Sequence, residues 1–462
     1  MERSNALGVL PVKRLMVSMG VPMILSMLLQ AVYNIVDSAF VSNMAEHGEE
    51  ALNALTLAFP LQMLMVAVSI GTGVGANALL SKSLGQSDLD KASCTAGNAL
   101  FMAAVIYVLF LLFGLAGVKG YIATQTKSAL ISSMAVKYLS ICCVYSFGIV
   151  FFSIYEKLLQ ATGRSLYSTI AQVSGAVTNI ILDPILIYGL LGLPKMGVSG
   201  AAYATVAGQV VSMVTALVFH LKKNIEISNK AEYLKPQLKL IGEIYSIGLP
   251  AMLAQALMSL MTYLMNLILG SVSEAMVTAY GLFYKVQQFI LFAAFGLRDA
   301  ITPIVSYSHG MKDKKRINDG VKYGLIYTAV IMLAGTLAVE LFALPFSKLF
   351  GLSGETQGLC ISAMHIISLS FVFAGANIAI QGIFQALNGG IQSLAVSICR
   401  QMLFVIPVAW AFAQAAKNSQ TSPRIIWLTF PIAEILSAVI AVVLMKRKFA
   451  AMGQRLSFKA IE

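Results

Sequence analysis

The sequence predicts an all-α integral membrane protein with twelve transmembrane helices in two six-helix lobes related by a parallel internal repeat. Its 462 residues are 58% hydrophobic and 11% charged, whereas soluble domains are about one-quarter charged. Twelve apolar runs are each long enough to cross ~30 Å of hydrocarbon as a helix. The runs lie near residues 14–40, 52–80, 94–117, 131–159, 166–189, 198–221, 243–270, 277–308, 320–343, 358–387, 393–414 and 425–446.

The repeat is visible as a 32-residue stretch that recurs 225 residues later without a gap. Seven positions are identical: Ala54, Leu57, Gln62, Gly71, Ser81, Ser83 and Gly85 match Ala279, Leu282, Gln287, Gly296, Ser306, Ser308 and Gly310. The same offset pairs Gln160 with Gln385, and Gly20-Val21-Pro22 resembles Gly248-Leu249-Pro250 at an offset of 228. Six spans per copy make the repeat parallel, and duplicated bundles are typical of transporters with alternating access.

We expect an N-lobe over residues 1–221, a polar cytoplasmic linker over 222–242, and a C-lobe with a basic tail over 243–462. A cavity between the lobes would be the transport path. Pro22 and Pro250 fall inside the first span of each copy, where a missing hydrogen bond weakens the helix. They are hinge candidates, although kinks in membrane helices also serve packing alone.

The basic residues predict the orientation. Sorted by alternating loops, 23 lysines and arginines fall on one side and six on the other. The positive-inside rule therefore places both termini in the cytoplasm, as expected for a multi-pass protein of the cytoplasmic (inner) membrane. Since the basic residues do not gather on one domain, the net charge of +12 does not indicate nucleic acid. Five cysteines and four scattered histidines show no metal-ligand spacing.

Charged side chains inside the bilayer are costly and usually functional. Asp37 shares a helical face with Gln30, Tyr33 and Asn34, and Asp183 shares one with Gln172 and Asn179. Two carboxylates at similar depth in one poorly solvated lobe favour a bound H⁺ or Na⁺. In the alternative, each aspartate caps a helix or is satisfied by a neighbour near the membrane surface.

The other charged residues of the spans and the methionines of span 7 have the following expected roles. Arg400 and Glu434 are expected to form a buried ion pair that fixes the second lobe. The neighbours Arg298 and Asp299 point in different directions on a helix, so they need not pair. Glu156 and Lys157 are expected at the cytoplasmic interface. Methionines of span 7 suit varied ligands, although such spacing also occurs in ordinary packing. The substrate-cleft candidates are Gln30, Tyr33, Gln62, Met258, Met261, Gln287, Gln381 and Glu434.

Three segments resemble the multidrug and toxic compound extrusion (MATE) transporters, and the resemblance extends over roughly residues 12–450. They are Gln30-Ala31-Val32-Tyr33-Asn34-Ile35-Val36-Asp37, Asn179-Ile180-Ile181-Leu182-Asp183-Pro184 and Gly200-Ala201-Ala202-Tyr203-Ala204-Thr205. The resemblance implies a V-shaped central cleft and export of cationic compounds in exchange for H⁺ or Na⁺.

Residue by residue, the resemblance implies cation coupling at Asp37, Asp183, Asn179 and Thr205, with Tyr138 as a looser match and Asn34 on the same face as Asp37. The site for Na⁺ would comprise Asp37, Asn179, Asp183 and Thr205. Pro22 matches a proline linked to helix bending. Some members carry an acid in span 7, where this chain has Gln255 and Ser259, so coupling is expected in the N-lobe.

The sequence therefore predicts a secondary active antiporter that exports cationic or amphiphilic drugs. The alternative within transport is a flippase for lipid-linked oligosaccharide. An intramembrane aspartyl protease would require a Gly-Asp context that both aspartates lack, so an enzyme is not expected. The expected partners are small organic cations, the coupling ion and the lipid bilayer. No further cofactor and no nucleic acid are expected, and the protein is expected to work as a monomer.

Overall fold

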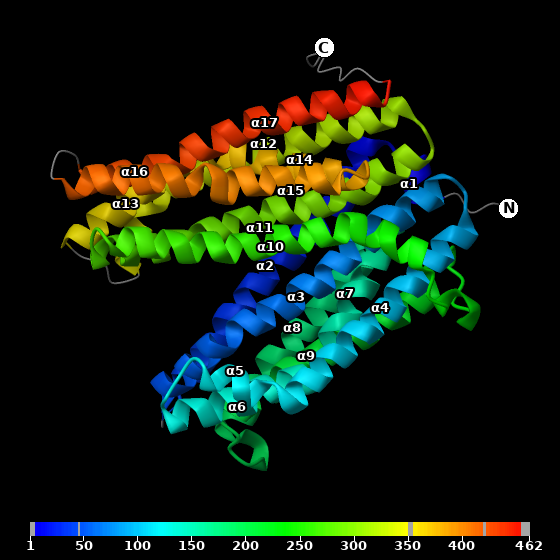
Figure 1. The fold of residues 1–462 in the computed structure, drawn as a ribbon. Helices are drawn as coiled ribbons and strands as arrows, with labels where there is room; N and C mark the ends of the chain where they lie inside the picture. Colours follow the sequence, from blue (N-terminus) through cyan, green and yellow to red (C-terminus); the bar gives the residue numbers. More distant parts are fainter. Residues whose placement is uncertain (1–4, 45–46, 350–353, 419–421, 454–462) are drawn as a thin grey trace. The chain divides into compact units, whose positions relative to one another are not determined.

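The computed structural model describes residues 5–44, 47–349, 354–418 and 422–453, and the regular structure of these residues is helical (Figure 1). The helices of the first half are α1 Ala6–Val9, α2 Val12–Ser42, α3 Gly48–Gly85, α4 Leu89–Ala116, α5 Val118–Ala123, α6 Ala129–Val144, α7 Phe147–Ala161, α8 Ser165–Tyr188, η1 Leu190–Gly192, α9 Val198–Lys223 and η2 Ala231–Leu234. The helices of the second half are α10 Leu238–Gly270, α11 Glu274–Gly310, α12 Lys314–Leu349, α13 Gly354–Ser368, α14 Phe371–Ala386, α15 Gly390–Ile398, η3 Cys399–Leu403, α16 Val405–Lys417, η4 Pro423–Leu428 and α17 Thr429–Ala451.

Ten helices in the described part of the chain are long and apolar enough to span a membrane, and two bent helix pairs raise the number to twelve. This confirms the predicted all-α membrane fold. The two pairs, α6–α7 and α13–α14, bend by 46° and 52°, although each was expected as one uninterrupted run. At both breaks a serine N–H bonds the carbonyl three residues back: Ser146 to Cys143 and Ser370 to Ile367. The breaks occupy nearly equivalent positions in the two copies.

The chain forms two compact units. One contains Met1–Gly8 and Leu25–Met252, and the other contains Val9–Ile24 and Leu253–Glu462. The division therefore passes through α2 and α10, the first long helix of each copy. The beginning of α2 packs with the second half of the chain, and the beginning of α10 packs with the first half. Pro22 and Pro250 each lie two residues before the point where their helix passes between units.

Glycines allow close packing of the two helix segments that belong to the unit of the other copy, which are the beginning of α2 and the beginning of α10. In the first unit, a Cβ on Gly71 would lie 2.9 Å from the Gly248 carbonyl oxygen, and a Cβ on Gly248 would lie 2.7 Å from that of Gly71. In the second unit, a Cβ on Gly296 would lie 2.7 Å from the backbone nitrogen of Ile24. Gly71 and Gly296 are equivalent in the repeat. The first helix of each copy thus crosses the second helix of the other copy at a glycine, where the backbones approach closely.

The polar segment after α9 lies within the first unit, along α4. Asn98 holds this segment through two hydrogen bonds. Its Oδ1 accepts the Gln237 N–H at 2.7 Å, and its Nδ2 donates to the Lys235 carbonyl at 3.3 Å. Lys91 on α4 also pairs with Glu243 at 2.8 Å. These contacts hold the start of α10 against the first unit.

Replacement of Gly75 by alanine is expected to destabilise the protein, because the new Cβ would lie 2.1 Å from the Ile244 carbonyl oxygen. Overpacking of this kind costs about 1–3 kcal/mol. Gly242→Ala is the matched control, since its Cβ meets nothing within 4 Å and alanine favours the helix. Thermal unfolding of purified protein in detergent should show a lower midpoint for Gly75→Ala only. Equal midpoints would contradict the close crossing.

Candidate functional site

The first unit brings together most of the residues predicted for cation coupling. Asp37 comes from α2, Tyr138 from α6, Asn179 and Asp183 from α8, and Thr205 from α9. Asn179 lies one helical turn before Asp183, and its Nδ2 donates to Asp183 Oδ1 at 3.3 Å. The carboxyl groups of Asp37 and Asp183 are interacting neighbours. Asp183 is fully buried and Asp37 is half-buried, so the pair lies largely inside the protein.

Four oxygens of this group are buried without a hydrogen-bond partner. They are Asp37 Oδ1, Asn179 Oδ1, Asp183 Oδ2 and Thr205 Oγ1. An unsatisfied buried polar atom costs about 1–3 kcal/mol, so such a set is unusual within one unit. Two carboxylates, an amide and a hydroxyl form an oxygen-rich donor set of the kind that hard cations prefer. We refer to these four residues as the oxygen cluster. The Asn34 side chain lies outside the described residues.

Two further predicted residues lie beside the oxygen cluster. Gln62 on α3 donates its Nε2 hydrogens to the Tyr138 hydroxyl at 3.3 Å and to the Cys142 sulfur at 3.5 Å. Tyr33 lies within electrostatic range of Asp37 and Cys142. Gln62 was expected in a substrate cleft, and the structure places it against Tyr138. Cys142 was not predicted, because a buried cysteine in an apolar run carries no functional signal in sequence.

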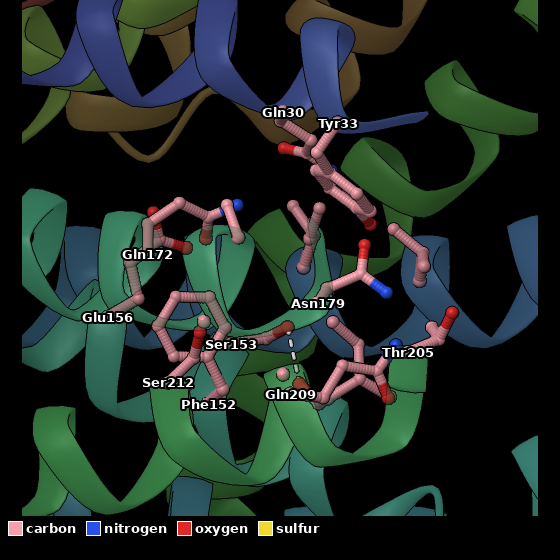
Figure 2. Close-up of a pocket in the computed structure, with 16 residues that line it drawn as sticks. Gln30, Tyr33, Phe152, Ser153, Glu156, Gln172, Asn179, Thr205, Gln209 and Ser212 are labelled. Atoms are coloured by element: carbon pink, nitrogen blue, oxygen red, sulfur yellow. Dashed lines mark hydrogen bonds between the residues drawn. The ribbon is translucent and has the colours of Figure 1, made fainter. Parts of the chain in front are cut away.

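A cavity of about 60 Å³ adjoins the oxygen cluster (Figure 2). Its lining residues are Gln30, Tyr33, Val66, Ile70, Ile149, Phe152, Ser153, Glu156, Gln172, Gly175, Ala176, Asn179, Thr205, Gly208, Gln209 and Ser212. A drug-sized ligand needs ~300–1,000 Å³, whereas one water needs ~10–15 Å³ measured in this way. The cavity therefore has room for several waters or a partly hydrated ion. It is too small for a drug.

Two glycines let the helices beside this cavity approach each other closely. The backbones of α8 and α9 cross where a Cβ on Gly175 would lie 2.4 Å from the Gly208 carbonyl oxygen, and the two helices pack side by side in Figure 1. The Ser212 hydroxyl occupies the space that a Gly175 side chain would need, and it lines the cavity with the other polar side chains.

The second unit contains the predicted ion pair. Arg400 Nη2 lies 2.7 Å from Glu434 Oε1, and Arg400 Nε lies 2.9 Å from Oε2. Asn377 Nδ2 adds a hydrogen bond to Glu434 Oε2 at 2.8 Å. The expectation of a buried Arg400–Glu434 pair is confirmed. Glu434, also considered for the substrate cleft, is fully engaged in this structural contact.

The structure shows a pair that the sequence left open and overturns one expectation about charges. Arg298 and Asp299 pair, with Arg298 Nη2 at 2.8 Å from Asp299 Oδ1, because the long arginine side chain can fold back to its neighbour. Glu156 and Lys157 are not interfacial, since only 9% and 1% of them is exposed. Both side chains are buried because α3, α4, α8 and α9 all pack on α7.

The remaining cleft candidates of the second unit lie in or near its core. Gln287 and Gln381 are buried, and Gln381 Nε2 has no hydrogen-bond partner. The Tyr280 hydroxyl approaches the Met261 sulfur at 3.9 Å. Met258 is half-buried. The structure does not join these four residues into one described pocket.

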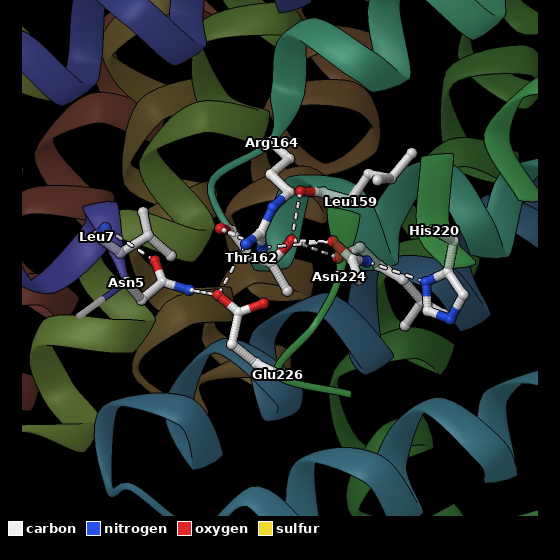
Figure 3. A network of polar contacts seen from close by, with 9 residues as sticks. Asn5, Leu7, Leu159, Thr162, Arg164, His220, Asn224 and Glu226 are labelled. Atoms are coloured by element: carbon white, nitrogen blue, oxygen red, sulfur yellow. Dashed lines mark hydrogen bonds and ion pairs between the residues drawn. The ribbon is translucent and has the colours of Figure 1, made fainter. Parts of the chain in front are cut away.

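A second polar network lies at the N-terminal end of α8 (Figure 3). Arg164 Nη2 pairs with Glu226 Oε1 at 2.9 Å, and Asn5 Nδ2 donates to the same oxygen at 3.2 Å. The Thr162 hydroxyl donates to Asn224 Oδ1 at 2.7 Å. The network ties the N-terminal segment, the α7–α8 turn and the segment after α9 together. Because Arg164 and Glu226 neutralise each other, its role is structural.

The two copies of the repeat differ most at the oxygen cluster. At offsets of 228 and 225 residues, Asp37, Asn179, Asp183 and Thr205 correspond to Met265, Phe404, Val408 and Phe430. Met265 and Phe430 belong to one buried apolar cluster of the second unit, and Phe404 packs against it. The oxygen cluster is therefore replaced by apolar packing in the second copy.

In the second copy, charged and polar side chains stand at positions that line the cavity in the first copy. At the 225-residue offset, Gly175 corresponds to Arg400, Gln209 to Glu434 and Phe152 to Asn377. The positions that border open space in the first unit thus hold the ion pair and its amide partner in the second.

Comparison with known proteins agrees with this architecture. Residues 22–185 and 250–411 match the MatE family model, one segment in each copy of the repeat. The chain belongs to the MatE family. Members of this family are membrane transporters and not enzymes, which confirms that expectation for this chain.

Relatives and solved structures support the assignment. The chain is 25% identical over 434 residues to the multidrug export protein MepA of Staphylococcus aureus, covering 94% of this chain and 93% of that one. It is 24% identical to MepA of Staphylococcus haemolyticus over 85% of each chain. A MATE crystal structure in a straight conformation matches with a TM-score of 0.90 at 24% identity, covering 97% and 98% of the two chains. A MOP superfamily transporter of Pyrococcus furiosus matches with a TM-score of 0.88 at 24% identity and the same coverage. The structural matches establish a shared fold.

Removal of one partner of the Arg400–Glu434 pair is expected to destabilise the second unit by about 3–5 kcal/mol, because an uncompensated charge stays buried. The double variant Arg400→Met/Glu434→Met should be closer to wild type than either single variant. Thermal unfolding midpoints in detergent measure this coupling. Additive effects of the two single changes would contradict the pairing.

Proposed function

We propose that the protein exports cationic or amphiphilic organic compounds in exchange for H⁺ or Na⁺. The observation that carries this proposal is the oxygen cluster, whose four buried oxygens have no partner inside the described protein. A cation would satisfy them. Membership of the MatE family supports transport, and the multidrug export activity named for the MepA relatives supports organic substrates.

The proposed mechanism is alternating access with coupling at Asp37 and Asp183. Empty, the pair holds two like charges in a buried place, which is unfavourable. Cation binding removes that repulsion and therefore favours the conformation in which the cluster is closed. An exported compound favours the other conformation. Exchange follows because each ligand has different affinities for the two states.

The substrate is proposed to contact residues other than the oxygen cluster, because the adjoining cavity is too small for a drug. Gln30 and Tyr33 line that cavity, so Met258, Met261 and Gln287 remain the candidates for that contact. Pro22 and Pro250 are proposed as hinges, since each lies just before its helix passes between the compact units. We further propose a monomer in the cytoplasmic membrane with both termini inside.

Efflux of a fluorescent organic cation from proteoliposomes tests the proposal, with pH and Na⁺ gradients imposed separately. Transport driven by one gradient alone identifies the coupling ion. Failure of both gradients to drive any tested cation would contradict the antiport proposal. Gradient-independent movement of a lipid-linked oligosaccharide would favour the flippase alternative.

Asp37→Asn and Asp183→Asn are each expected to lower gradient-driven efflux by about 100-fold or more, in line with loss of an essential proton or ion carrier. Asparagine can neither bind a proton at neutral pH nor neutralise Na⁺. Both variants should fold, because the change removes a buried charge. Asp90→Asn, an exposed position on α4, is the matched control. Wild-type efflux rates in both site variants would remove the role assigned to the pair.

A further inference from the structure

The cavity beside the oxygen cluster contains one more ionisable carboxyl group. Glu156, on α7, lines the cavity together with Asn179 and Thr205, which belong to the oxygen cluster. Figure 2 shows Glu156 and Gln172 near each other and apart from Thr205. Asp, Lys and Arg are absent from the described lining, so Glu156 is its sole charged residue. The cavity thus connects two places where a cation can be held.

The path between these places follows one face of α8. Gln172 and Asn179 are seven residues apart, which is two helical turns and about 10 Å, and both line the cavity. Gly175 lies between them on the same face and also lines the cavity. Amide and hydroxyl groups of Gln172, Gln209 and Ser212 offer hydrogen bonds to water along the way. A cavity that is polar and roomy enough holds water.

The surroundings of Glu156 suit reversible binding. Gln160 Nε2 donates to Glu156 Oε1 at 3.0 Å, and Lys157 Nζ donates to Gln160 Oε1 at 2.9 Å. The Gln160 amide thus bonds both the Glu156 carboxylate and the buried Lys157 ammonium. The ammonium offsets part of the cost of a buried negative charge at Glu156. It also weakens the hold on an added cation, because like charges repel.

The repeat shows that this arrangement is particular to the first copy. At the 225-residue offset Glu156 corresponds to Gln381, whereas Gln160 corresponds to an identical residue, Gln385. The helix and the amide are kept, but the carboxyl group occurs only beside the cavity and the oxygen cluster. If Glu156 served packing alone, its carboxyl group would not need to lie beside the cavity and the oxygen cluster.

We propose that Glu156 is a second binding station for the coupling cation, reached from Asp37 and Asp183 through the water-sized cavity, on the way to the cytoplasm. The inference rests on the proposed antiport. On the proposed topology the α7–α8 turn is cytoplasmic, so Glu156 lies on the inner side of the oxygen cluster.

The transfer balances for either ion. For H⁺, the O–H bond of the protonated aspartate breaks and its electron pair stays on that carboxylate. Each intervening water accepts one proton and passes one on, and a new O–H bond forms on the Glu156 carboxylate. For Na⁺, the ion moves between carboxylates and no covalent bond changes. The separate pH and Na⁺ gradients distinguish the two ions.

Glu156→Gln tests the station in proteoliposomes. We expect gradient-driven efflux of a fluorescent organic cation to fall by about 100-fold, the lower range for loss of a positioned proton carrier. Drug–drug exchange without a cation gradient, and equilibrium binding of the same dye, should stay within about twofold of wild type, because the cavity cannot hold a drug. Glu156→Asp keeps a carboxyl group and should restore part of the coupled efflux. Glu232→Gln, an exposed position beside Lys230, is the matched control.

The outcomes separate this inference from the proposed function. Wild-type coupling in Glu156→Gln together with its loss in Asp183→Asn would overturn the station and leave the antiport intact. Wild-type coupling in both variants would overturn the antiport. If Glu156→Gln loses dye binding or does not fold, Gln172→Met decides, because it removes polar lining and leaves Glu156 in place. Selective loss of coupled efflux in that variant supports the station, and wild-type efflux overturns it.

Discussion

Hydrocarbon supplies no hydrogen bonds, so every polar group of a membrane-spanning bundle has to find its partner within the protein. Most of this chain obeys that constraint through local contacts. The hydroxyls of Ser69, Thr72 and Thr328 each donate to the carbonyl four residues back. Arg400 and Glu434 satisfy each other with the help of Asn377. The oxygen cluster departs from this pattern, because it gathers four unpartnered oxygens from three helices, and two of them belong to carboxyl groups.

The internal repeat supplies a control for that observation. Both copies have a broken helix pair and a glycine crossing of the first helix, whereas the counterpart of α8 in the second copy is interrupted by the π-helical turn Cys399–Leu403. Where the first copy has Asp37 and Thr205, the second has Met265 and Phe430 in an apolar core. The second copy thus folds with apolar residues at these positions. The chemistry of the polar residues in the first copy fits a bound cation.

The sequence was sufficient for the spans, the repeat and the grouping of Asp37 with Asp183, because these depend on hydrophobic length, identity at a fixed offset and helical spacing. It was insufficient for the exchanged helix segments. Hydropathy reports that α2 and α10 are apolar but not which helices they contact. The helix breaks at Ser146 and Ser370 carry no proline and so gave no signal.

The burial of Glu156 was missed for a related reason. Distance from a helix end predicts depth, yet whether a side chain meets lipid headgroups or other helices is decided by residues far away in sequence. The cavity that Glu156 lines adjoins the crossing of Gly175 with Gly208, which neither helix reveals alone. By contrast, the Arg400–Glu434 pair could be predicted, because two opposite charges in the apolar interior of one lobe have few other ways to be neutralised.

The specialisation of one copy also has an energetic reason. An oxygen of the cluster that neither water nor a cation reaches costs about 1–3 kcal/mol. A few such losses are a large part of the stability of a typical domain, about 5–15 kcal/mol. A second such cluster would leave little stability for the empty transporter, which has to exist between cation release and rebinding. A duplicated fold avoids the conflict when one copy carries the coupling chemistry and the other places an ion pair and an apolar core at the same positions.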